Sequence, residues 1–243
     1  MAMRGLVTAL RTLSILPAPG RDADRMAAAL PWFPAVGALL GWLLLSAAWG
    51  LERIGLWEQG TAFFVLAAGV ALTGAIHIDG VADCADGLGG GRDREKRLAI
   101  MKDSHVGVFG VTAVILLLLG KWVCLTRLFQ TGGHLWLPTA WIVSRTAPVA
   151  LAFYLPYARD KGTGADFVRG SRWPHLAAAL ALASLLIALG GGAAHLGAWI
   201  PALPMVFLWG YYTRRRLGGV TGDVLGAGVE MTETLILATG CLP

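Results

Sequence analysis

Five aspartates lie within residues 77–110 of a chain that is otherwise mostly apolar. Three of them, Asp79, Asp83 and Asp86, have the spacing i, i+4 and i+7, so on a helix they point the same way within an arc of roughly 60°. Carboxylates this close repel one another unless a cation lies between them. Mg²⁺ prefers oxygen ligands and usually combines one or two carboxylates with phosphate oxygens and water. The spacing therefore predicts a Mg²⁺ site, the alternative being an acidic helix face that is only solvated or salt-bridged.

A glycine-rich segment follows these aspartates directly. It contains Gly89 and Gly90 and leads into Arg92 and Arg94. We expect the glycines to end the helix and to turn backbone N–H groups towards an anion, as in phosphate-binding loops. The alternative is a flexible turn, because the segment matches neither of the usual nucleotide-binding glycine patterns. The charged neighbours favour the anion site.

A short interfacial helix is predicted over residues 94–102. Asp93 is placed to cap its N-terminus, and its apolar side chains would face the membrane surface. This helix would return Lys102 and Asp103 to the mouth of the next span. Lys102 could then hold a phosphate as a point charge, and Asp103 could be a further metal ligand or a general base.

A second polar segment lies late in the sequence, at residues 214–233. Its GGVTGD turn places Thr221 and Asp223 at the start of an apolar helix. A compact turn with an acid that opens a buried helix indicates a functional role, so we expect both residues to contribute to the site. The arginines that precede the turn are expected to act mainly as a topology signal.

The composition predicts a membrane protein. Of the 243 residues, 56% are hydrophobic and only 14% are charged, and the mean hydropathy of +0.64 exceeds that of soluble domains. Several apolar runs have about the 20-residue length that crosses roughly 30 Å of hydrocarbon. We expect one all-α domain over residues 1–243, a polytopic helical bundle with six or seven transmembrane helices, of which the run 199–213 is the doubtful one. The runs are 31–50, 61–78, 106–126, 134–156, 175–198, 199–213 and 224–242.

The positive charges indicate an orientation. Most of the 20 Lys and Arg residues lie in the N-terminal segment and in alternate predicted loops, at residues 92–102, 159–172 and 214–216. Under the positive-inside rule these segments, and the acidic cluster with them, face the cytoplasm. This excess explains the net charge of +5 and favours anionic lipid headgroups, so we expect no nucleic-acid partner.

Ionisable residues also occur inside predicted spans, where they are costly and usually functional. Arg145 either reaches the cytoplasmic site or forms a buried ion pair with Glu230 or Glu233. His77 points away from Asp79 on an ideal helix, so we expect a packing role for it. The three cysteines are far apart in the sequence and indicate neither a disulfide framework nor a zinc site.

Several motifs occur in register along the chain. The most specific are HIDGVADCADG and MKD within residues 77–103, glycines at 107 and 110, and GGVTGDVLGA at residues 218–227. They are accompanied by Pro17 and Pro19, by FPAVGALLG at residues 33–41 and by YARDKGTGADF at residues 157–167. Together these motifs resemble the cobalamin synthase family, the adenosylcobinamide-GDP ribazoletransferases, over most of the chain.

The resemblance implies a reaction and its setting. The adenosylcobinamide phosphoryl moiety passes from adenosylcobinamide-GDP to alpha-ribazole or alpha-ribazole 5′-phosphate, GMP leaves, and Mg²⁺ assists. The family implies the cytoplasmic face of the bacterial inner membrane. The choice of acceptor and a homo-oligomeric state both stay open.

This reaction gives each candidate residue an expected role. The residues expected to hold Mg²⁺ are Asp79, Asp83 and Asp86. Those expected to take part in catalysis are Asp103, Lys102 and Asp223. Those expected to bind substrate are Arg92, Arg94, Gly89, Gly90, Arg145 and Thr221.

Two other functions compete with this interpretation. CDP-alcohol phosphotransferases that make phospholipids also combine clustered aspartates with Mg²⁺, but after Asp79 and Gly80 this sequence departs from their motif. A cation-coupled transporter would also place acids in a bilayer, usually near the midplane and within inverted repeats. Here the acids crowd one end beside a basic loop, and no repeat is evident.

Overall fold

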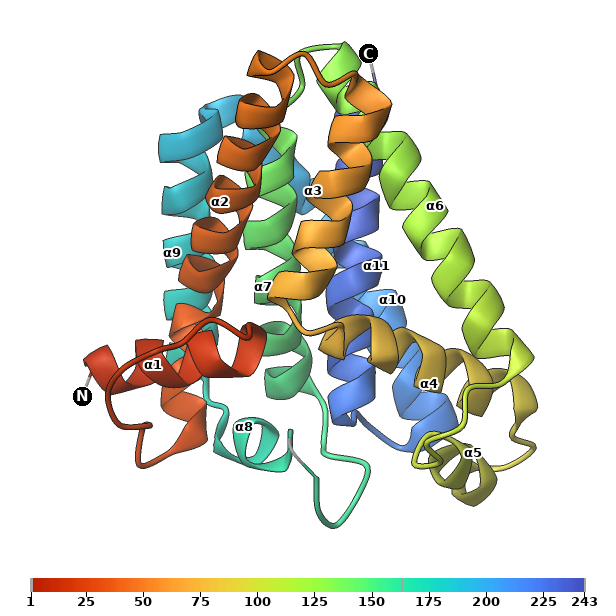
Figure 1. The fold of residues 1–243 in the computed structure, drawn as a ribbon. Helices are drawn as coiled ribbons and strands as arrows, with labels where there is room; N and C mark the ends of the chain where they lie inside the picture. The colour runs from red at the N-terminus through yellow and green to blue at the C-terminus, as the bar shows by residue number, and fades with distance from the viewer. Residues whose placement is uncertain (1, 163, 243) are drawn as a thin grey trace.

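The protein is helical throughout the residues that the structure describes, 2–162 and 164–242 (Figure 1). In this computed structural model, those ranges contain no β-strand and one isolated bridge, between Tyr157 and Val220. The prediction of an all-α fold is confirmed. The long helices that run along the bundle are α2 (Phe33–Arg53), α3 (Glu58–Leu72), α6 (Val108–Gln130), α7 (Trp136–Tyr154), α9 (Trp173–Gly191), α10 (Trp199–Leu217) and α11 (Gly222–Gly240).

The remaining helices lie at the two ends of the bundle. We call the base the end at which α3 is followed by α4 (Figure 1). The helices at the base are α1 (Ala2–Leu13), η1 (Met26–Trp32), α4 (Ile76–Gly90), α5 (Arg94–Ile100) and α8 (Ala165–Gly170), whereas η2 (Ala193–Ala198) precedes α10 at the opposite end.

The long helices correspond to the predicted apolar runs. Four segments are long and apolar enough to cross a membrane, and α3 with α4 makes a fifth if this bent pair is counted as one. The doubtful run 199–213 belongs to one of the four. The helices α7 and α11 are not among them. The four segments are Met26–Arg53, Val108–Gln130, Trp173–Gly191 and Ala193–Leu217. The number of crossings, six or seven, stays a prediction.

Small residues bring α2 against α7. A Cβ on Gly41 would lie 2.7 Å from the Cα of Pro138, and a Cβ on Gly37 would lie 3.0 Å from the carbonyl carbon of Trp141. Backbones this close need glycine, as the four-residue spacing of these glycines predicts for helices in lipid. The contact makes α7 the most buried helix of the bundle, with α2, α9 and α11 packed around it.

The chain bends sharply between α3 and α4. The two helix axes differ by 87°, and Gly74 and Ala75 at the corner both have left-handed φ angles, of 60° and 58°. The bend turns α4 along the base instead of continuing the span (Figure 1). The acidic stripe therefore lies at one end of the bundle, outside the four segments that are long and apolar enough to cross a membrane by themselves.

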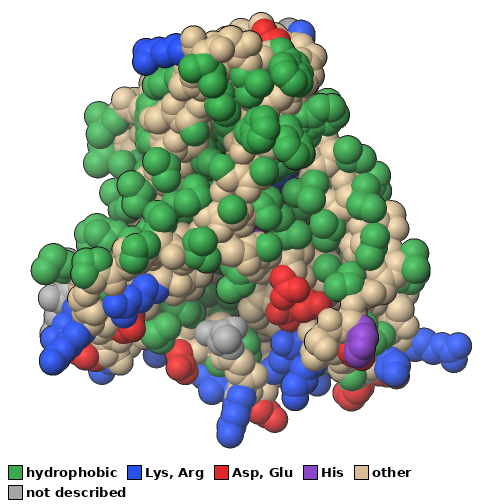
Figure 2. Space-filling model, viewed as in Figure 1, with side chains coloured by type: hydrophobic (Ala, Val, Ile, Leu, Met, Phe, Trp, Pro, Cys, Tyr) green, Lys and Arg blue, Asp and Glu red, His purple; other side chains and the backbone are tan. Residues whose placement is uncertain are grey.

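Charged side chains gather at the base. Figure 2 shows Lys, Arg, Asp and Glu along this end, below a wide apolar surface. Arg53 and Arg127 lie in the last turns of α2 and α6, at the opposite end. The predicted grouping of the basic loops on one side is thus present in the fold. Which compartment that side faces stays a prediction.

Candidate active site

The site forms where α4 crosses the first turn of α11. A Cβ on Gly80 would lie 2.6 Å from the carbonyl oxygen of Asp223 and 3.1 Å from its Cα. Because only glycine fits here, the two helices approach closely at this point. The crossing brings the acidic stripe of one predicted motif to the acid of the other, although more than 100 residues separate them in the sequence.

Three carboxylates meet at this crossing. Asp79 is exposed and Asp83 is half-buried. Burial together with the neighbouring carboxylates of Asp223 and Asp79 raises the pKa of Asp83 to about 7, and Arg159 offsets part of this effect. The site therefore carries more negative charge than its arginine balances, and this is the electrostatic condition that attracts a cation.

Asp223 is held by two neighbours. The Thr221 hydroxyl donates to Asp223 Oδ2 at 3.2 Å, and the Arg159 guanidinium lies 3.1 Å from the same oxygen. Thr221 also caps α11, since its Oγ1 accepts a hydrogen bond from the Val224 amide at 3.3 Å. Because Thr221 is fully buried, the structure gives it a positioning role where we had expected substrate contact.

Arg159 is a site residue that sequence reasoning missed. Its guanidinium also donates to the carbonyl oxygen of Met101 at 3.2 Å, so it connects the 157–167 segment to the end of α5. From the sequence, we had placed Arg159 only among the positive charges of a basic loop. Its position in the YARDKGTGADF motif was the signal that could have identified it.

The Asp86 carboxylate is hydrogen-bonded to the backbone of another helix, α6. Its two oxygens accept hydrogen bonds from the Gly107 amide at 2.6 Å and the Gly110 amide at 2.8 Å, and its side chain is buried. These amides belong to the N-terminus of α6, where helices leave donors unsatisfied. The structure therefore gives the Asp86 carboxylate a capping role on α6, and its role as a Mg²⁺ ligand stays a prediction.

The glycine-rich segment ends α4, because the helix stops at Gly90 and Gly91 is its C-cap. Gly89 and Gly90 are the last two residues of the helix. The predicted helix end within the glycine run is thus confirmed, whereas the anion-binding role of Gly89 and Gly90 stays a prediction. A Cβ on Gly89 would lie 2.9 Å from the Phe109 ring, and one on Gly87 would lie 3.0 Å from the Arg97 carbonyl oxygen. Close packing of α5 and α6 explains these glycines.

The basic residues around α5 differ in their contacts. Asp93 caps α5 by accepting from the Lys96 amide at 2.8 Å, which confirms the predicted cap, although the helix ends at Ile100. Arg94 donates to the carbonyl oxygens of Leu217 and Ala158, each at 2.8 Å. Arg94 thus fastens α5 to the two loops beside it.

Two predicted residues after α5 are exposed, as is Arg92 before it. Lys102 and Asp103 lie in the segment that joins α5 to α6. The Asp103 carboxylate is bonded to the His105 ring nitrogen at 2.7 Å and to the His105 amide at 3.0 Å, and these bonds lower the pKa of Asp103. These are the hydrogen bonds that the structure gives the Asp103 side chain, and its catalytic role stays a prediction.

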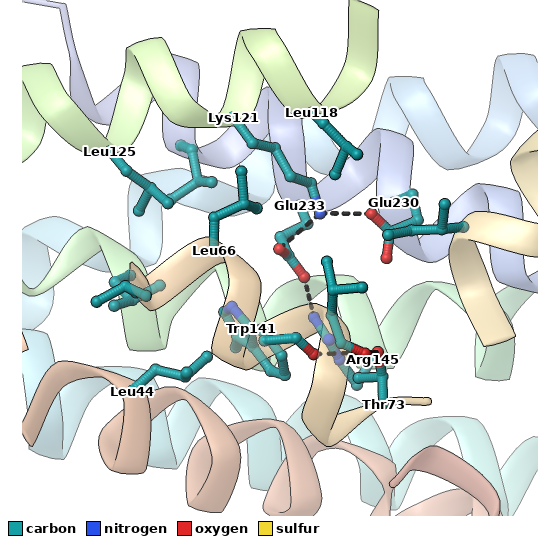
Figure 3. Close-up of a pocket in the computed structure, with 16 residues that line it drawn as sticks. Leu44, Leu66, Thr73, Leu118, Lys121, Leu125, Trp141, Arg145, Glu230 and Glu233 are labelled. Atoms are coloured by element: carbon teal, nitrogen blue, oxygen red, sulfur yellow. Dashed lines mark hydrogen bonds and ion pairs between the residues drawn. The ribbon is translucent and has the colours of Figure 1, made fainter. Parts of the chain in front are cut away.

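A second group of charges lies inside the bundle (Figure 3). Lys121 Nζ donates to Glu230 Oε2 at 2.5 Å and to Glu233 Oε1 at 2.7 Å. Arg145 donates to Glu233, and its guanidinium carbon lies 3.6 Å from the centre of the Trp141 ring. We call Lys121, Arg145, Glu230 and Glu233 the ion cluster. Its four side chains are buried.

Arg145 belongs to the ion cluster and pairs with Glu233. Of the two predicted alternatives, the structure has the ion pair with Glu233, so the substrate-binding role of Arg145 is corrected. His77 Nδ1 lies 4.0 Å from Glu230, in the buried packing position we expected. Sequence reasoning missed Lys121 as their partner, because it lies on α6, far away in the sequence.

Fold and site together define a class, namely a polytopic helical membrane protein with an acidic site at one end of its bundle. A family model described as cobalamin-5-phosphate synthase matches residues 5–241. The chain therefore belongs to the cobalamin-5-phosphate synthase family, as its motifs indicated. No solved structure matches it.

Curated relatives cover nearly the whole chain and are named adenosylcobinamide-GDP ribazoletransferase. The protein of Chlorobium phaeobacteroides is 47% identical over 98% of this chain and 97% of its own length. That of Prosthecochloris aestuarii is 45% identical with the same coverage, and that of Novosphingobium aromaticivorans is 36% identical over 97% and 95%. These matches support the family resemblance and neither of the two competing functions.

Proposed function

We propose that this chain is an adenosylcobinamide-GDP ribazoletransferase. The family match over residues 5–241 carries the proposal. In the reaction, a hydroxyl oxygen of alpha-ribazole or its 5′-phosphate forms a bond to the phosphorus that carries the adenosylcobinamide moiety. The bond from this phosphorus to the bridging oxygen of the GDP group breaks, and GMP leaves. The products are adenosylcobalamin or its 5′-phosphate.

We infer that Mg²⁺ is the cofactor and that the helix crossing holds it. Within residues 2–162 and 164–242, no three His, Cys, Asp or Glu side chains are arranged to hold a metal ion by themselves. Mg²⁺ does not need three, because it usually binds one or two carboxylates together with substrate phosphates and water. Asp79 and Asp83 fit this requirement, since Asp83 is surrounded by negative charge that Arg159 balances only in part.

The chain's own residues would divide the remaining work. Bound Mg²⁺ would neutralise negative charge on the phosphoryl oxygens. Asp223, which is held by Thr221 and Arg159, would orient one substrate from the α11 side of the crossing. The exposed Arg92 and Lys102 are free to attract the nucleotide phosphates from the surrounding solution. Each of these roles is electrostatic or positional, as phosphoryl transfer requires.

The location follows from the charge distribution. Basic residues concentrate at the base, where the acidic site also lies (Figure 2). By the positive-inside rule we place the base in the cytoplasm and the bundle in the bacterial inner membrane. A cytoplasmic site would receive a nucleotide-activated substrate without transport.

An assay of the purified protein tests the proposal. Detergent-purified protein is incubated with adenosylcobinamide-GDP and with alpha-ribazole or its 5′-phosphate, with Mg²⁺ or with EDTA. GMP and the corrinoid product are followed by mass spectrometry. We expect equal amounts of GMP and cobalamin product, and only with Mg²⁺. A folded, lipid-supplemented sample that releases no GMP would contradict the proposal, and turnover in EDTA would contradict the metal.

A further inference from the structure

An apolar cleft opens on the side of the bundle between α7, α9 and α10. Its volume is about 410 Å³, within the range of about 300–1,000 Å³ that is typical of ligand pockets. Ala147 and Leu151 of α7 form part of its floor, and Val206 and Phe207 of α10 line one wall. Phe207 is 72% exposed, so the cleft is open to whatever surrounds the bundle. In a membrane-spanning protein the surroundings at this depth are lipid chains.

The polar groups of the cleft are concentrated towards its ends. Tyr154, Tyr211 and Arg214 line the end near the base, and Trp199 lines the opposite end, where α10 begins. Between these ends the lining is apolar except for two threonines. An apolar cleft with a cation and tyrosine hydroxyls at one end matches a phospholipid, which has a charged headgroup at one end and apolar acyl chains along the rest.

Arg214 is the positive charge in the cleft lining, and it differs from the next two arginines. The guanidinium carbons of Arg215 and Arg216 lie over the rings of Tyr211 and Tyr212, at 5.0 Å and 5.5 Å from the ring centres. In the described ranges, the Arg214 guanidinium has no ion-pair or hydrogen-bond partner, and the residue is exposed. Arg214 is therefore available to an anion at the mouth of the cleft.

The length of the cleft fits one leaflet. From Ala202 to Arg214 the helix α10 rises roughly 18 Å, and one leaflet contributes about half of the roughly 30 Å of hydrocarbon in a bilayer. A lipid whose phosphate lies at Arg214 could therefore place one acyl chain along the whole cleft. If a second copy of this chain filled the cleft instead, that contact would not require a cation at one end and apolar walls along the rest.

We propose that this cleft binds one anionic phospholipid, with an acyl chain between α7 and α10 and the headgroup phosphate on Arg214. The lipid would come from the leaflet at the base, which is also the end that carries the acidic site. The binding is separate from the transferase reaction, since no residue of the cleft belongs to the helix crossing.

Lipid retention tests the proposal without measuring turnover. The protein is reconstituted in vesicles of equal parts phosphatidylglycerol and phosphatidylcholine, extracted in a mild detergent and weighed by native mass spectrometry. Arg214→Gln removes the charge, and Arg215→Gln is the matched control outside the cleft. Ala150→Phe fills the cleft, and Ala178→Phe adds the same ring on an exposed position of α9.

We expect the wild-type protein and both controls to retain one phosphatidylglycerol. Arg214→Gln should lower the preference for phosphatidylglycerol over phosphatidylcholine roughly fivefold, the effect of one basic residue at a membrane surface, and Ala150→Phe should abolish retention. The proposal is overturned if the wild-type protein retains no lipid or retains both lipids equally. It is also overturned if Arg214→Gln and Arg215→Gln lose the preference to the same degree.

Discussion

Two charged regions of this protein use the same helix in opposite ways. At the base, the Asp223 carboxylate of α11 lies near two carboxylates of α4, and a single arginine balances their charge in part. Inside the bundle, Glu230 and Glu233 of the same helix face two cations and are fully paired. Charge alone therefore does not identify a candidate active site. What distinguishes the base is charge that the protein leaves unbalanced and within reach of solvent.

The two regions also depend on each other. The ion cluster joins α6, α7 and α11, and α11 in turn carries Asp223 to the glycine contact with α4. Buried ion pairs contribute little net stability, but losing one partner is costly because a charge then remains uncompensated. The cluster therefore fixes the position of α11, and the position of α11 completes the site.

The largest effect should come from breaking the ion cluster. Lys121→Met leaves Glu230 and Glu233 with Arg145 alone, so we expect a loss of stability of about 3–5 kcal/mol. Thermal unfolding in detergent would show a lower Tm, and activity would fall in proportion to the folded fraction. Adding Glu230→Gln to Lys121→Met restores the charge balance and should recover part of the lost Tm. If the double variant is less stable than Lys121→Met, the charge-balance explanation is wrong.

The next effect concerns chemistry at the base. Asp83→Asn keeps the shape of the side chain and removes its charge, so we expect kcat to fall by about 100-fold, or roughly 2.7 kcal/mol, while the Tm changes little. Steady-state GMP release and thermal unfolding measure the two quantities on one sample. Turnover near that of the wild-type protein would remove Asp83 from the catalytic account.

A smaller effect separates Asp86 from its neighbours on the stripe. Asp86→Asn keeps one acceptor for the α6 amides but loses the charge at the helix N-terminus, so we expect a loss of about 1–2 kcal/mol in stability. The folded protein should keep its dependence on Mg²⁺ concentration. A Mg²⁺ titration checks this, and a tenfold higher Mg²⁺ requirement with an unchanged Tm would restore Asp86 as a metal ligand.

The smallest effect is expected at Asp103. This side chain is exposed, and the contacts that the structure gives it are with His105. Asp103→Asn should leave the Tm unchanged and kcat within about threefold, as for most surface substitutions. A fall comparable to that of Asp83→Asn would instead identify Asp103 as the general base that the sequence suggested.

Features that depend on neighbouring residues could be predicted from the sequence. Hydropathy located the long helices, Asp93 and Thr221 marked helix starts, and the spacing of Gly37 and Gly41 indicated close packing. These signals are local, because caps and helix faces are set within a few residues.

Features that depend on distant residues could not be predicted in this way. Asp86 looks like its neighbours until the amides of α6 are placed against it. The glycines after it resemble a phosphate-binding loop, but the sequence does not reveal that Gly87 and Gly89 also pack against a carbonyl and a ring of other helices. The sequence suggested two acidic partners for Arg145. Lys121 was identified as the second cation only in the structure, where three helices come together.

The ion cluster also constrains how the chain is made. Its cations lie on α6 and α7, whereas both carboxylates lie on α11, which the ribosome produces after them. A Lys or Arg at the centre of an inserting helix costs about 2.5–3.5 kcal/mol, so Lys121 and Arg145 enter the membrane before their counter-ions exist. A chain that stops short of α11 keeps two uncompensated cations at membrane depth. An unfinished copy would thus differ from a completed one by two buried cations without their carboxylates.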